Sequence, residues 1–293
     1  MKINKMKTIL NTAFALILAG TLFTSCTKKE GCTDPAATNF NVEAEKDDGT
    51  CTYATPEEII VEEETEAHIT FNFTHHFDGV PVTAANFNQF SFVNANGDTL
   101  SISKLRYLVS DMKLYRPDGT VNINEGYNLV DVTNNTGLSY SIAGTDLGAL
   151  VSMRFNFGFD TTDNSGNYVD LNSASWGVPT MMGGGYHGMQ MEGMYKKNGA
   201  DSVFAYHHIV TKRPSMMAPF EANHIEVSLP GIALNEHNVV VELKMNIAEW
   251  FKNPSTWDLD TYHSALMMNY NAQAMMHQNG YNAFTLGVVS QKK

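Results

Sequence analysis

The feature that most constrains this chain is a strict alternation of apolar and polar residues that begins at His68. From position 69 to position 75 the odd-numbered residues are Ile, Phe, Phe and His, whereas the even-numbered residues are Thr, Asn and Thr. Side chains on a β-strand point to opposite faces in turn, so this period of two predicts a half-buried strand.

Similar short runs recur along the chain and are separated by turn sequences such as Asn-Gly and Pro-Asp-Gly. Strands broken by such turns are typical of an antiparallel sheet, so the sequence predicts a mainly β fold, a sandwich or barrel-like domain. Only the C-terminal part suggests helix, in a short segment at 247–251 and again at 259–279. The further predicted strands are 89–93, 100–114, 127–132, 151–159, 188–195, 203–209, 224–229 and 239–245.

The N-terminus has the three-part pattern of an export signal. Three Lys precede an apolar run that ends at Leu22, and small residues then lead to Cys26. This pattern is typical of a secretory signal and not of a membrane span. Because the run resembles a bacterial lipobox, residues 1–25 are predicted to be a lipoprotein signal peptide and Cys26 the lipidated N-terminus. Simple secretion without a lipid is the alternative.

Export places the two remaining cysteines in an oxidising compartment. Cys32 and Cys51 are close in sequence, so a disulfide between them is predicted within a small module at 26–53. The module resembles short GCTDP…DDGSC modules of surface proteins in Bacteroidetes-type bacteria. Its acidic residues could hold calcium, but Asp-Gly is equally the chemistry of a plain turn, which the spacing favours.

The distribution of charge indicates a linker and argues against nucleic acid as a partner. Residues 54–67 are rich in Glu and predict an acidic linker, which leaves 68–289 as the main domain. The formal net charge is −12, and the chain has no cluster of basic residues beyond the signal. Nucleic-acid binding is therefore not expected.

Methionine and histidine stand out in number and in placement. The chain has 16 Met and 10 His, and five of these Met and one His lie within 181–194. On an extended strand His187, Met189 and Met191 would project from the same face. Imidazole beside thioethers suits Cu(I), whereas calcium and magnesium prefer oxygen ligands. Met side chains that merely fill a core are the alternative.

Two His pairs also lie on predicted strands, at 75–76 and at 207–208. The two rings of each pair point to opposite faces, so one ring at most from each pair can reach a shared site. The sequence carries no Gly-x-Ser-x-Gly, no phosphate-binding Gly-rich loop before a helix and no His-Glu-x-x-His. The protein is therefore not expected to be an enzyme.

The order of several motifs resembles that of the MbnP-like family, extracytoplasmic copper-binding proteins related to those encoded beside methanobactin genes. The resemblance covers essentially residues 68–288. Its more specific parts are Leu-Arg-Tyr at 105–107 with the following Ser110, and the Gly-Tyr…Glu-Gly pattern at 185–193. Its other parts are Phe-Thr-His at 73–75, Gly-Val-Pro-Val at 79–82, Arg-Phe-Asn-Phe-Gly at 154–158, Phe-Ala-Tyr-His at 204–207 and the end of the terminal helix at 279–284.

The resemblance implies a mainly β domain that binds one copper ion through two histidines, which match His75 and His207 here. In some relatives a tryptophan two residues before the first His is oxidised by a dihaem partner and completes the site. This chain has Phe73 at that position, which puts the modification and the partner in doubt. The predicted ligand set is therefore His75, His207, His187 and Met189, with Met191 close by, and Cu(I) as the favoured ion.

Together these features predict an exported outer-membrane lipoprotein, periplasmic or on the cell surface, that sequesters, stores or hands on copper. Its expected partners are the copper ion, the membrane through the lipid, and a copper-handling protein or dihaem oxidase. One alternative is a cell-surface recognition or adhesion sandwich without a metal. A copper oxidoreductase is a lesser one.

Overall fold

The protein is described by a computed structural model that covers residues 28–54, 66–215 and 217–293. These residues belong to two separate units, a small N-terminal module and a main domain that begins at Glu66. Cys26, the predicted lipidation site, lies outside the described residues, as does most of the predicted linker. Among the helices of the described part, none is long and apolar enough to cross a membrane.

The main domain consists mainly of strands, with a few short helices. Its strands are β3 (Glu66–Phe77), β4 (Val80–Pro81), β5 (Phe92–Val93), β6 (Thr99–Tyr115), β7 (Val121–Asp131), β8 (Ser139–Ser141), β9 (Thr145–Asp146), β10 (Gly148–Ala149), β11 (Ser152–Phe157), β12 (Met189–Lys197), β13 (Ala200–His208), β14 (Thr211–Lys212), β15 (Phe220–Glu221), β16 (Ile225–Pro230), β17 (Ala233–Leu234), β18 (Asn238–Asn246) and β19 (Phe284–Lys292). Its helices are α1 (Val169–Ser173) and α2 (Tyr270–Gly280), with 3-10 turns η1 (Ala84–Asn86), η2 (Asp163–Ser165), η3 (Thr180–Met182), η4 (Ile247–Phe251) and η5 (Leu266–Met268).

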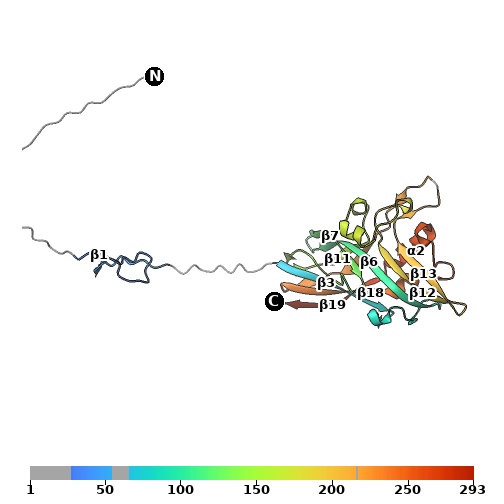
Figure 1. The fold of residues 1–293 in the computed structure, drawn as a ribbon, viewed down its shortest axis with the longest axis horizontal. Coiled ribbons are helices and arrows are strands. Elements are labelled where there is room, and N and C mark those ends of the chain that lie inside the picture. The colour runs from blue at the N-terminus through green and yellow to red at the C-terminus, as the bar shows by residue number, and fades with distance from the viewer. Residues whose placement is uncertain (1–27, 55–65, 216) are drawn as a thin grey trace, which may run out of the picture. The chain divides into compact units, whose positions relative to one another are not determined.

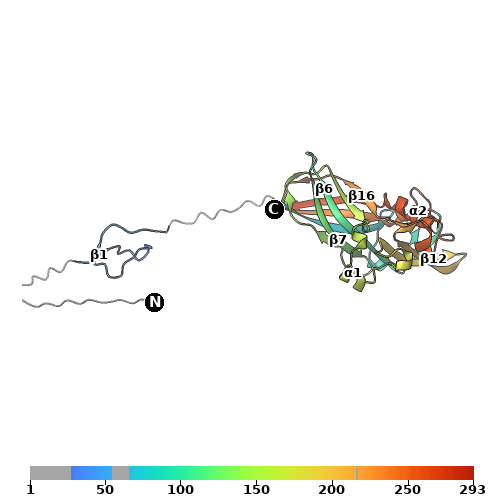
Figure 2. The ribbon, with the colours of Figure 1, turned by 90° about the horizontal axis from the view of Figure 1, so that it is seen from above.

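Two sheets hold the main domain together. The first has the order β13-β12-β6-β11-β16, with β5 and β7 also paired to β6, and the second has the order β19-β18-β3-β4, with β8 and β9 paired to β3. Figure 1 shows β3, β18 and β19 side by side, next to the strands of the first sheet, and α2 near the β12–β13 end. Figure 2 shows the domain turned by 90°, with β6, β7, β12 and β16 of the first sheet labelled. The predicted mainly antiparallel β fold is confirmed, and the pairing of β3 with β18 is a parallel exception.

The core lies between the two sheets and explains the sequence alternation. On β3 the odd-numbered side chains are buried against the first sheet, and the even-numbered ones are partly exposed. At 25 cal/mol per Å² of apolar surface, a fully buried Phe contributes about 2 to 3 kcal/mol before entropy is counted. The alternation at 69–75 is therefore the pattern of one strand in a sandwich.

The C-terminal region differs from the prediction in two respects. The helix predicted at 259–279 is shorter, because residues 259–265 form turns and α2 begins only after Asn269, whose side chain accepts a hydrogen bond from the Ala272 N–H. The last residues then form β19, an edge strand beside β18 that the sequence analysis did not predict. The short segment at 247–251 is helical as predicted, as a 3-10 turn.

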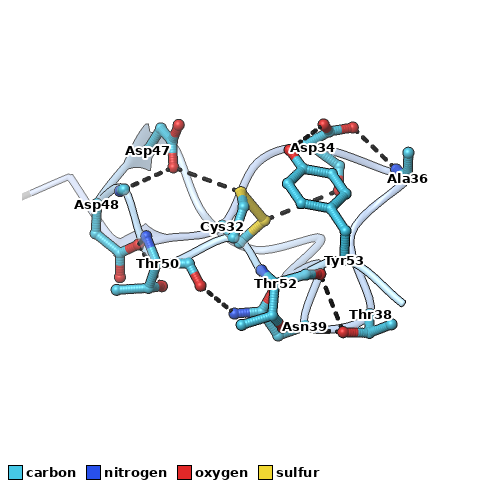
Figure 3. The surroundings of a disulfide bond; sticks show 12 residues. Cys32, Asp34, Ala36, Thr38, Asn39, Asp47, Asp48, Thr50, Thr52 and Tyr53 are labelled. Carbon is cyan, nitrogen blue, oxygen red and sulfur yellow. Dashed lines mark hydrogen bonds between the residues drawn. A yellow bond between two sulfur atoms is a disulfide. The ribbon is translucent and has the colours of Figure 1, made fainter. Parts of the chain in front are cut away.

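The N-terminal module is a small loop-rich unit with two short parallel strands, β1 (Glu30–Gly31) and β2 (Lys46–Asp47). The predicted disulfide between Cys32 and Cys51 is confirmed and lies at the centre of the module (Figure 3). A cross-link of this kind is what a unit with so little apolar core needs to stay folded.

The acidic side chains of the module bind its own backbone and hydroxyl groups. Asp34 accepts hydrogen bonds from the Ala36 N–H and the Tyr53 hydroxyl, and Asp47 accepts one from the N–H two residues further on. Asp48 does the same with the following Thr (Figure 3). These are the hydrogen bonds of Asx turns, which supports the turn interpretation of this sequence over a calcium site.

Candidate metal centre

The structure separates the five predicted metal ligands into a group in the core between the sheets and a group on the outer side of the first sheet. Residues directly opposite each other on paired strands share a face, and here Gln190 lies opposite His207, whereas Met189 lies opposite His208. Met191 lies opposite Tyr206, which is also buried. Met189 and Met191 are both fully buried in the core between the sheets, so His207 is on the outer face, away from them.

His75 also belongs to the core and not to the outer face. It lies on β3, is 7% exposed, and its Nε2 is 3.0 Å from the hydroxyl oxygen of Tyr107 on β6. The two rings are 5.7 Å apart at their centroids. Burial lowers the pKa of His75 to about 4, so the ring is neutral at neutral pH. The structure thus gives His75 a partner within the core and does not bring it to His207.

His187 differs from the predicted strand pattern. The strand begins only at Met189, and the preceding Gly183, Gly184 and Gly185 all have left-handed backbone conformations, with φ of 112°, 68° and 71°. The alternation therefore does not extend back to His187, and its ring lies beside His207 instead of beside the two Met. The centroids of these two imidazoles are 5.3 Å apart, and the rings are nearly perpendicular.

Each of the two imidazoles is oriented through one of its ring nitrogens. The Nδ1 of His187 is 2.8 Å from the Trp176 carbonyl oxygen, which can only accept, so the proton is on Nδ1 and the lone pair on Nε2. The Nε2 of His207 is 3.0 Å from a carboxylate oxygen of Glu192, which leaves the lone pair on Nδ1. Hydrogen bonding of the second nitrogen to a carbonyl or carboxylate is the usual arrangement around a metal-binding histidine.

Both rings are in the protonation state that binds metal. Burial lowers the pKa of His187 to about 4, although the hydrogen bond to the Trp176 carbonyl opposes the shift. Burial also lowers the pKa of His207, and the hydrogen bond to Glu192 opposes it. A metal ion needs a neutral imidazole, so at neutral pH no proton has to be displaced from either ring.

Charged side chains of β6 and β12 surround this histidine pair. Lys104 lies opposite Glu192 in the register and donates to the same carboxylate oxygen at 2.8 Å. Arg106 lies opposite Gln190, its guanidinium is 5.1 Å from the Trp176 ring centroid, and it donates to Gln190 and to a backbone carbonyl. Two cations and one carboxylate therefore border the two neutral rings.

A separate group of carboxylates is formed by β6 and the segment around η2. Asp111, Asp160 and Asp163 have oxygens within 4.8 Å of one another, the one such group of three found in the described part of the chain. Burial, followed by the charges of the other two, raises the pKa of Asp111 to about 6. Asn156 donates to the same carboxylate at 2.9 Å. An all-oxygen group suits hard cations and not copper.

Comparison with known proteins agrees with the motif order. The family model described as MbnP matches residues 66–273, from the first residue of β3 into α2. The chain belongs to the MbnP family. A solved structure, MbnP from Methylosinus trichosporium, resembles it with a TM-score of 0.45 and 11% sequence identity, over 65% of this chain and 79% of that one. No curated protein matches the chain.

The MbnP-family match covers the strands of both sheets except β19 and leaves out the disulfide module, and the residues of the candidate site lie inside the matched region. Three of its residues were not predicted as part of a site: Lys104, Arg106 and Trp176. Lys104 and Arg106 come from β6 and are placed by its register with β12, whereas Trp176 comes from the loop after α1 and contacts His187. Glu192 belongs to a family motif noted in the sequence, but its contact with His207 had no sequence signal.

Proposed function

We propose that this MbnP-family protein binds copper through His187 and His207 on the outer face of its first sheet. Membership of the family supports a copper-related role. The observation that carries the proposal is the pair of neutral imidazoles, 5.3 Å apart, each with its second nitrogen already hydrogen-bonded.

The separation of the two rings suits one bound ion. A metal–nitrogen bond to histidine is about 2 Å long, so two imidazole nitrogens around one ion are separated by roughly 4 Å when the arrangement is linear. The ring centroids are 5.3 Å apart, which is a separation of the size expected for two imidazoles that share one ion. Nε2 of His187 and Nδ1 of His207 are the two nitrogens for which the described residues provide no hydrogen-bond partner, so they are the nitrogens available to the ion.

This ligand set is smaller than the one the sequence suggested. His75 is engaged by Tyr107, and Met189 and Met191 fill the core on the opposite face of the sheet. We therefore assign these three residues to packing. A role as a copper cargo protein is supported by the partly exposed side chain of His207, which is 18% accessible and so leaves room for ligand exchange with an acceptor.

The cellular setting of this function is also a proposal. The N-terminal sequence supports export and attachment to the outer membrane through a lipid on Cys26, with the acidic segment at 54–67 as a tether. In that setting a copper site on a tethered domain could pass its ion to other exported proteins. Radiolabelled fatty acid should be incorporated into the wild-type chain and not into a Cys26→Ala variant.

Metal analysis after dialysis tests the ligand assignment. The wild-type protein should retain about one copper ion per chain, and His187→Ala with His207→Ala should retain none. The matched control is His75→Gln, which changes a buried histidine of the core and should leave the stoichiometry at one. Loss of copper in the control with retention in the double variant would refute the assignment.

A further inference from the structure

A cleft that is separate from the His187–His207 pair lies between the loops that follow β11 and β13. Its volume is about 500 Å³, which is the size of a small-molecule site. Its polar side chains are mostly uncharged and include Thr161, Asn164, Ser165 and Asn172. The one charged residue in its lining, Glu221, is paired with Arg213 at 2.8 Å. The cleft therefore suits an uncharged polar ligand.

A much smaller cavity adjoins this cleft. The two spaces share three lining residues, Asn164, Tyr186 and Val210. The smaller one, the inner cavity, has a volume of about 10 Å³, which is the space of about one water molecule. A single oxygen atom of a larger ligand can therefore enter it from the cleft.

The inner cavity exists because two strands of the first sheet meet end to end along β6. Leu108 of β6 accepts a hydrogen bond from the N–H of Gly158, which follows β11, and donates one to the carbonyl of Gly188, which precedes β12. A Cβ at Gly188 would lie 2.5 Å from Nδ1 of His208. The two glycines thus leave the junction unfilled, with His208 at its wall.

The inner cavity contains a buried donor that has no acceptor. His208 is 1% exposed, and the described residues provide no hydrogen-bond partner for its Nδ1. Its Nε2 accepts from the amide nitrogen of Asn223 at 3.1 Å. The same nitrogen donates to the Ile209 carbonyl oxygen at 2.9 Å, which fixes the orientation of the amide. The proton of His208 is therefore on Nδ1, and an unpaired buried N–H is costly.

His224 adds a second nitrogen to the same cavity. Its Nδ1 is buried and also lacks a partner among the described residues. A hydroxyl group satisfies both rings, because its oxygen accepts from Nδ1 of His208 while the group can donate to or accept from His224. A metal ion does not fit, since Nδ1 of His208 is protonated and its Nε2 is engaged by Asn223.

We propose that this cleft binds an uncharged polyol of monosaccharide size, with one hydroxyl group in the inner cavity between His208 and His224. The other hydroxyl groups of the ligand meet the amides and hydroxyls of the cleft, and its C–H surface packs against Val210 and Phe220. Neither histidine belongs to the proposed copper pair, so this inference goes beyond the proposed function and does not depend on it.

Saturation-transfer NMR with D-glucose, D-galactose, D-mannose and L-fucose, each at about 10 mM, tests the proposal, with acetate as a charged probe. At least one sugar should bind the wild-type protein, and acetate should not. His224→Leu removes one partner of the inserted hydroxyl and should weaken sugar binding about tenfold. The matched control is His237→Leu, which removes a histidine whose Nδ1 is bonded to the Glu66 carbonyl, and it should leave the affinity unchanged. Absence of sugar binding, binding of acetate alone, or equal affinity in all three proteins overturns the inference.

Ring-nitrogen NMR of the wild-type protein covers the case in which His224→Leu folds poorly. The Nδ1–H resonance of His208 should shift when the bound sugar supplies its acceptor. The ring resonances of His75, whose Nε2 lies 3.0 Å from the Tyr107 hydroxyl, should not move. A His208 resonance that stays unchanged at saturating sugar would mean that water alone occupies the inner cavity, and it would overturn the proposal.

Discussion

Replacing His75 by Gln should make the fold less sensitive to acid. In the folded protein the pKa of His75 is about 4, because burial disfavours the charged ring and the adjacent His76 adds to the effect, whereas in the unfolded chain it is near 6.5. As the pH falls through 6.5, His75 becomes protonated in the unfolded chain but stays neutral in the folded protein. The unfolding free energy is therefore unaffected by His75 above pH 6.5 and falls progressively as the pH is lowered from 6.5 towards 4.

The magnitude follows from these two pKa values. Between pH 7 and pH 5 the linkage relation gives a loss of about 2 kcal/mol of unfolding free energy from His75 alone. Gln does not titrate, and its amide can still bond with the Tyr107 hydroxyl, so the variant should lose about 2 kcal/mol less than the wild type over the same range. Buried His187 and His208 also titrate with lowered pKa, but equally in both proteins, so the difference isolates His75.

Urea unfolding followed by tryptophan fluorescence at pH 7, 6 and 5 measures this difference. The result that would refute the reasoning is a parallel loss of stability in wild type and variant. Such a result would mean that His75 is charged or hydrated in the folded protein, and with it the assignment of His75 to the core would fail.

Two further predictions concern the sheet and the site. Gly193→Ala should destabilise the domain by about 1 to 3 kcal/mol, because the new Cβ would lie 1.9 Å from the Ser101 carbonyl oxygen, whereas Gly177→Ala, whose new Cβ would be 4.0 Å from its nearest neighbour, the Gly185 carbonyl oxygen, should change the melting temperature little. Copper should stay bound as the pH is lowered to about 5, since burial keeps the pKa of His187 near 4 and lowers that of His207; release complete by pH 6 in a chelator competition would contradict this.

The sequence predicted the strands better than the site, for a physical reason. Alternation along one segment reveals which side chains share a face of that strand, and this was sufficient for β3 and for the pairing of Met189 with Met191 on one face. It cannot reveal the register between strands, which decides which side chains of neighbouring strands lie opposite each other. His207 and Met189 were therefore predicted to bind the same ion, although the pairing of β12 with β13 places His207 opposite Gln190.

Local backbone geometry explains the remaining difference. The prediction for His187 assumed an extended chain, but three consecutive glycines in left-handed conformations precede it and the strand starts two residues later. Lys104 and Arg106 are separated from Glu192 by more than eighty residues, so their contribution depends on tertiary pairing alone. The family resemblance added the copper role, and the structure added the residues that surround the proposed ion.

The central claim is that the copper ion lies on the outer face of the first sheet, between two histidines. An anomalous-difference map at the copper edge, from crystals loaded with Cu(I) under anaerobic conditions, tests it directly. The account predicts one strong peak within about 2 Å of His187 Nε2 and of His207 Nδ1. A peak in the core beside His75 and Tyr107, with none at the outer pair, would contradict it.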